Sequence, residues 1–171
     1  MADLNNLIQE HHSLLVKFLA CRTNMKIDTF EVLIDGETIS IPNRLYVDFS
    51  LPSKHTDAQK LVWSCLYSRM SDGLVRERFL KEIIFTDSPY VVPYVIQFCG
   101  EYVLEIIDII HSNLNKLNRR MYQDFIVANP EFIFKTKQRA VSYWDCAFQH
   151  ERSSNENRRA FEVIEYFKSP A

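Results

Sequence analysis

Glycine is scarce in this chain: only 3 of its 171 residues are glycine. Loops that cradle phosphate groups with backbone N–H groups need closely spaced glycines, because a side chain would block the approach of the phosphate. Neither a P-loop nor a GxGxxG pattern occurs, and the GxSxG, HExxH and EF-hand patterns are missing as well. The sequence therefore carries no motif of these nucleotide-binding, hydrolytic or calcium-binding classes.

Cysteine is also sparse and widely spaced. The chain has four cysteines and no CxxC pair: Cys21, Cys65, Cys99 and Cys146. This usage is typical of reduced thiols in a reducing compartment. Cys65 and Cys99 lie among apolar residues, and we expect both to be small core residues.

No charge of one sign predominates. The 20 basic and 22 acidic residues are interleaved and give a net charge of −2, so no electrostatic footprint for nucleic acid or an anionic membrane is present. The first residues lack the basic and apolar regions of a secretory signal. The apolar segment 91–110 is interrupted by Pro93, Gly100 and three carboxylates, which are costly inside a membrane. We therefore expect a cytoplasmic protein without a membrane span, and nucleic acid is disfavoured as a partner.

Material for a hydrophobic core is abundant. Hydrophobic residues make up 47% of the chain and aromatic residues 13%, and no proline-, glycine- or serine-rich linker divides it. We predict a single, mainly α domain over residues 1–171, with several helices around a central apolar helix and a small β-hairpin near residues 30–41. The hydrophobic periodicity predicts helices near residues 4–20, 57–70, 74–85, 89–115, 119–128, 130–149 and 154–168.

The predicted central helix, from Pro89 to Leu114, is apolar except for one narrow polar line. At about 100° per residue, the members of this line fall inside a sector about 80° wide. They are Gln97, Glu101, Glu105, Asp108 and Ser112. The apolar remainder predicts packing on about three sides, with Ser88 as the N-cap and with Pro93 and Gly100 as points where the helix can bend or divide.

Shorter signals mark the other elements. Thr56 to Gln59 and Ser153 to Glu156 are capping boxes that start helices. Asp35-Gly36 favours a type I′ turn, because both positions of that turn need positive φ. This turn sets a register that pairs Ile34 with Glu37, Val32 with Ile39 and Phe30 with Ile41. A third short strand is expected at Leu45, Val47 and Phe49, and the inward face of the helix at 130–149 is expected to contain Ile133, Val141, Trp144 and Phe148.

Between Asp57 and Ile84, an amphipathic helix is followed by a short turn that carries Asp72 and by a helix that opens with Val75-Arg76. This arrangement resembles a HEAT-type helical hairpin, in which the Asp and Arg of neighbouring units hydrogen-bond and the stacked helices present a surface for partners. The resemblance covers about one sixth of the chain, and a second Asp-x-x-Val-Arg does not occur. It implies that Asp72 and Arg76 are structural residues of a turn.

The polar line is the first candidate site. Gln97, Glu101, Glu105 and Asp108 are interpreted as a solvated edge of the central helix or as a surface that contacts a partner. As an alternative, these carboxylates bind a cation or act as acid and base with a histidine, since Asp108-x-x-His111 has the spacing of di-metal helical bundles. Such sites need a second motif of this kind on another helix, and the sequence has none. No metal or other cofactor is therefore expected.

Three weaker constellations complete the candidates. His11 lies on the apolar face of the first helix, where a buried imidazole with a hydrogen-bond partner is the usual outcome. Cys146 and His150 are four residues apart on one helix, which supplies too few ligands for a metal site. Gly73 lies in a turn typical of a helix-turn-helix DNA reader, but Glu77 and Glu82 offset the basic residues of the second helix.

The sequence thus favours a helical domain that binds another protein, in an interaction or regulatory role. Two alternatives stay open at this stage. One is an enzyme or metal-binding protein that uses the carboxylates and a histidine of the central helix, and the other is a helix-turn-helix DNA reader.

Overall fold

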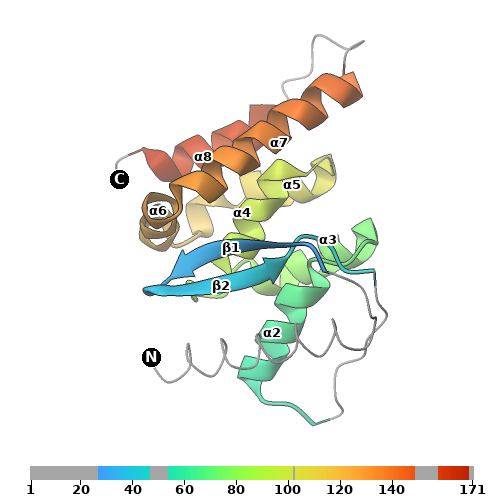
Figure 1. Ribbon diagram of the computed structural model, residues 1–171, viewed down its shortest axis with the longest axis vertical. Coiled ribbons are helices and arrows are strands. Elements are labelled where there is room, and N and C mark those ends of the chain that lie inside the picture. The colour runs from blue at the N-terminus through green and yellow to red at the C-terminus, as the bar shows by residue number, and fades with distance from the viewer. Residues whose placement is uncertain (1–26, 47–53, 102, 149–157, 170–171) are drawn as a thin grey trace. The chain divides into compact units, whose positions relative to one another are not determined.

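The computed structural model describes residues 27–46, 54–101, 103–148 and 158–169, with the backbone alone at 143–148 (Figure 1). The described chain is mainly helical and has one small antiparallel hairpin, which confirms the predicted fold class. It divides into two compact units, residues 1–83 and 84–171. The expectation of a single domain stays a prediction, and each unit is treated separately below. Within these ranges, no helix has both the length and the apolar character that crossing a membrane requires.

The first unit contains the predicted hairpin, formed by β1 (Thr29–Ile34) and β2 (Glu37–Pro42). The turn residues Asp35 and Gly36 have φ angles of 51° and 84°, as a type I′ turn requires. The observed register is the predicted one. Alternate residues are buried on one face: Val32, Ile34, Ile39 and Ile41. The Asp35-Gly36 turn and the two-residue hydrophobic period therefore specify the same strand register.

Of the expected third strand, the structure describes Leu45, which does not pair with β1 or β2. Leu45 instead forms an isolated parallel bridge with Met70, in which its N–H donates to the Arg69 carbonyl (2.8 Å) and its carbonyl accepts from the Ser71 N–H (2.8 Å). Val47 and Phe49 lie outside the described residues, as do the predicted helix at 4–20, His11, the second capping box and His150.

The helical hairpin of the first unit consists of α2 (Asp57–Tyr67) and α3 (Gly73–Ile83). Thr56 caps α2 in the predicted capping box with Gln59. Asp72 accepts hydrogen bonds from the N–H groups of Leu74 (2.8 Å) and Val75 (3.4 Å) and so stabilises the start of α3.

Arg76, only 2% exposed, folds back over the turn between α2 and α3. It donates to the carbonyls of Met70 (3.1 Å) and Ser71 (2.7 Å). Asp72 and Arg76 therefore both hold this turn together through backbone groups. These contacts suit the structural part that the HEAT resemblance implies for them, while the resemblance itself stays a prediction.

The second unit shows that the prediction of one helix from 89 to 115 is wrong. The segment forms α4 (Val92–Gln97), the 3-10 turn η1 (Phe98–Gly100), α5 (Leu104–His111) and the 3-10 turn η2 (Leu114–Lys116). The backbone becomes extended at Glu101 (φ −116°, ψ 164°) and at Val103 (φ −89°, ψ 97°), which separates η1 from α5. Ser88 is not the N-cap, because α4 begins at Val92 with Pro93 in its first turn, where proline is tolerated.

Gly100 gives a physical reason for the break. A Cβ atom at this position would lie 3.2 Å from the Thr136 carbonyl oxygen and 3.3 Å from the Thr136 Cγ2. The chain at η1 thus approaches α7 (Pro130–Phe148) so closely that a side chain at position 100 would require Thr136 to shift by a few tenths of an ångström. The turn η1 contacts α4, α5, α7 and α8 (Arg159–Lys168). Dividing the apolar segment therefore lets its middle enter the core of the unit.

The helices α6 and α7 start at their predicted positions, 119 and 130, while the predicted start of the last helix at 154 lies outside the described residues. The Asn118 side chain caps α6 (Arg119–Ala128) by accepting from the Met121 N–H at 3.2 Å. The prediction for the inward face of α7 is correct at Ile133, which is buried, and wrong at Val141, which is 43% exposed. Among the α7 residues whose side chains are described, 130–142, the buried ones are Phe132, Ile133, Thr136 and Ala140. In Figure 1, α7 and α8 lie side by side, and both contact α6.

Candidate functional site

The structure does not bring the predicted polar residues into one line. Gln97 and Glu101 are buried, at 3% and 6% exposure. Glu105 is exposed on α5, and Asp108 is half-buried on the same helix. Because the backbone is extended at Glu101 and at Val103, the helix is interrupted, and residues before and after these positions do not share a helical face. The expected continuous edge is therefore divided into a buried part and a surface part.

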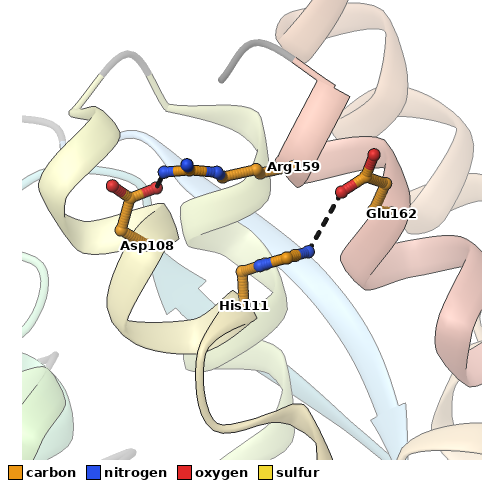
Figure 2. A network of polar contacts seen from close by, with 4 residues as sticks. All are labelled: Asp108, His111, Arg159 and Glu162. Atoms are coloured by element: carbon orange, nitrogen blue, oxygen red, sulfur yellow. Dashed lines mark hydrogen bonds and ion pairs between the residues drawn. The ribbon is translucent and has the colours of Figure 1, made fainter. Parts of the chain in front are cut away.

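The surface part joins a polar network between α5 and α8, shown in Figure 2. The Arg159 guanidinium donates to the Asp108 carboxylate. One turn further along both helices, the His111 Nε2 lies 3.0 Å from the Glu162 Oε2. Figure 2 shows the side chains of Arg159 and His111 in the space between the two helices. Each member of the Asp108-x-x-His111 motif thus contacts a side chain of α8.

This network does not resemble a metal centre. In the described part of the chain, no group of three or more histidine, cysteine, aspartate or glutamate residues is placed to hold a metal ion. The Glu162 carboxylate lies within hydrogen-bond distance of the His111 imidazole, a contact that by itself is only one part of what an acid–base site needs. All four side chains of the network are at least 32% exposed, so the contacts are those of a solvated interhelical link.

The described cysteines are core residues, as predicted. Cys65 and Cys99 are both fully buried and free. Burial raises the pKa of Cys65 well above its usual range. Burial raises the pKa of Cys99 from 9.0 to about 12, with Glu101 as a smaller contributor in the same direction. Both thiols therefore stay protonated at neutral pH and are poor nucleophiles or metal ligands.

The basic residues of α3 do not form a cationic face. Lys81 lies 2.6 Å from Glu77, and Arg78 lies 3.7 Å from Glu82. Arg76 folds into the turn between the helices. Arg76, Arg78 and Lys81 are the cations that a DNA-reading second helix would offer to phosphates, and each of them contacts an acidic side chain or a backbone carbonyl of this chain.

An exposed apolar feature on α7 was missed by the sequence analysis. We define the α7 stripe as Phe134, Gln138 and Val141, which lie within about 60° on one side of this helix. Phe134 is 60% exposed and Val141 is 43% exposed. The signal was present in the sequence Phe132-Ile133-Phe134, because a helix that buries two adjacent large residues turns the third away from the core.

A pocket of about 280 Å³ lies in the second unit, beside the first turn of α6. It combines side chains from the segment after α3, from the end of η2 and from α6. The lining residues are Ile84, Phe85, Thr86, Asp87, Lys116, Leu117, Asn118, Met121 and Tyr122. These residues come from two stretches about thirty positions apart in the sequence, so no local motif points to the pocket.

Comparison with known proteins adds no relative from which a function can be transferred. No protein-family model, curated protein or solved structure matches this chain.

Proposed function

We propose that this chain acts by binding another protein, and that the α7 stripe takes up an amphipathic helix of that partner. The exposure of Phe134, a residue that is 60% exposed, is the observation that carries the proposal. A large aromatic side chain on a helix surface leaves apolar area in water that a partner can cover. Aromatic residues also contribute a large share of binding energy in protein interfaces.

The surroundings of the stripe favour an apolar contact. Lys135 forms an ion pair with Glu131 at 2.7 Å, and its hydrogen bond lowers the pKa of that carboxyl. Lys137 pairs with Glu165 of α8. Because these charges are neutralised within the chain, recognition depends on shape and apolar area. Phe134 and Val141 are seven residues apart, a spacing that suits the apolar positions of a partner helix.

The two alternatives have less support. A metal or acid–base site on the central helix would require its carboxylates to converge, whereas Glu101 is buried and Asp108 pairs with Arg159. A DNA reader would require cations at a helix surface, whereas those of α3 contact acidic residues or backbone carbonyls.

The test uses a photoreactive side chain, p-benzoyl-L-phenylalanine, placed at position 134 in the full chain and expressed in the native host. The control carries the same group at Arg120, which is 90% exposed on α6. We expect a discrete protein adduct at position 134 that is missing at position 120.

The captured protein is then purified and titrated against the wild-type chain and Phe134→Ser. We expect the substitution to weaken binding by about tenfold or more while the melting temperature is retained, because the side chain is exposed. Equal affinity of both chains, or no adduct specific to position 134, would overturn the proposal. Sedimentation velocity shows whether the captured partner is a second copy of this chain.

A further inference from the structure

The pocket beside α6 holds two opposite charges that do not neutralise each other. Asp87 and Lys116 both line it, yet within the described ranges neither forms an ion pair. The Asp87 carboxylate accepts a hydrogen bond from the Asn118 Nδ2 at 2.8 Å. The Lys116 ammonium donates to the Asn113 Oδ1 at 3.0 Å. Each of the two charged groups is thus hydrogen-bonded to an asparagine amide and not to the other charge.

Some exposed charges of the second unit pair along a helix, as Glu131 does with Lys135 and Arg120 with Asp124, whereas Asp87 and Lys116 do not. A carboxylate and an ammonium held at separate points of one pocket present complementary charge to a molecule that carries both signs. A ligand of one sign would meet attraction from one of these groups and repulsion from the other.

The rest of the pocket supplies an apolar wall of limited size. Leu117 and Met121 provide aliphatic surface, and the Phe85 ring centroid lies 5.9 Å from the Lys116 Nζ. Tyr122 is buried and stacks on Phe167 with ring centroids 4.3 Å apart, which fixes this side of the pocket. The volume of about 280 Å³ is just below the range typical of drug-sized ligands, so it suits a molecule of about ten heavy atoms.

We propose that this pocket binds a small zwitterion of the α-amino-acid class with an apolar side chain. The ligand carboxylate pairs with Lys116 and its ammonium group with Asp87. The apolar side chain packs against Leu117 and Met121. This site is separate from the α7 stripe, so the inference does not depend on the protein-binding function proposed above.

The test titrates the full chain with L-leucine and L-phenylalanine and follows binding by calorimetry and by protein NMR. Two analogues of leucine serve as probes of the charges: 3-methylbutylamine lacks the carboxylate, and 4-methylpentanoate lacks the ammonium group. We expect saturable binding of at least one amino acid and binding about tenfold or more weaker for each analogue, because each leaves one pocket charge without a partner.

Asp87→Asn and Lys116→Gln remove one charge each while keeping a similar side-chain size. Each is expected to weaken amino-acid binding by about tenfold or more, and Arg120→Gln, outside the pocket, is the matched control that retains it. Circular dichroism and NMR spectra of each variant show whether the fold is preserved. The proposal is overturned by the absence of saturable binding up to about 10 mM, by analogues that bind as well as leucine, or by binding that survives both substitutions.

Discussion

Replacing Gly36 tests whether the hairpin turn depends on backbone conformation alone. This residue has a φ of +84°, and a Cβ atom built on it would meet nothing within 4 Å. A substitution therefore adds no steric contact, and its cost is that of placing an L-residue in the left-handed region. That cost is about 1 kcal/mol for alanine and about 1–2 kcal/mol for valine, whose branched side chain resists positive φ further.

The expected order of destabilisation is Gly36→Val, then Gly36→Ala, then Gly36→Asn, because asparagine tolerates this backbone region best of the three. Gly73→Ala is the matched control. Its φ is not positive, and its new Cβ would lie an ordinary 3.8 Å from the Arg76 Nη2. This control should be neutral or stabilising by about 0.5–1 kcal/mol, since alanine restricts the unfolded chain.

The measurement is urea unfolding followed by tryptophan fluorescence. The chain has two tryptophans, Trp63 in α2 and Trp144 in α7, so a Trp144→Phe background reports on the first unit alone. Equal unfolding midpoints for all Gly36 variants would refute the type I′ turn. A loss for Gly36→Asn as large as that for Gly36→Val would show that the cost does not come from φ.

Three further predictions concern the second unit. Ile106→Asp should abolish the folding of the second unit, because it buries an unpaired carboxylate at a position that is 1% exposed. Glu105→Gln should change the unfolding free energy by less than about 0.5 kcal/mol. Similar losses for both variants in circular dichroism melts would contradict the burial of Ile106 and the exposure of Glu105. Cys99 should resist Ellman's reagent in the native protein and react after unfolding. Burial raises the pKa of Cys99 from 9.0 to about 12, so the free energy of unfolding should be constant below pH 9 and should fall as the pH rises from 9 to 12. The fall should be less steep in Cys99→Ala. Equal pH dependence of the unfolding free energy in both proteins would refute this. Asp108→Asn and Arg159→Gln should each cost less than about 1 kcal/mol, with a coupling of similar size in a double-mutant cycle, because the pair is partly exposed; a coupling of several kcal/mol would contradict a solvated link.

The parts of the fold that the sequence predicted correctly are those set by local signals. The hairpin register follows from Asp35-Gly36 and the two-residue period, and the start of α2 follows from a capping box within four residues. The sequence predicted one helix over residues 89–115 and named Gly100 as a point where it can divide, but it did not predict that the helix ends there. Its apolar periodicity continues through Glu101, and the close approach of Gly100 to Thr136 is a contact between distant residues.

The candidate site shows the same division between local and distant information. A helical projection places Gln97 and Asp108 on one line only while the helix is continuous, so the break changes the surroundings of both. The partner of Asp108 is 51 residues away, and Asp87 and Asn118 meet across 31 positions. Only the exposure of Phe134 was accessible from the sequence, through the crowding of three large residues on a helix.

The two contacts between α5 and α8 have a consequence for topology. Along the chain direction, α5 presents the carboxylate of Asp108 and then the imidazole of His111, while α8 presents the guanidinium of Arg159 and then the carboxylate of Glu162. When His111 is protonated, a shift of α8 by one turn would place Glu162 against Asp108 or Arg159 against His111, and an inverted α8 would oppose like charges at both positions. Attraction between such exposed groups adds little to stability, and repulsion between them is of similar size, but both disfavour the shifted and the inverted arrangement. While His111 is protonated, the order of these four groups thus adds a small bias toward the observed direction and register of α8.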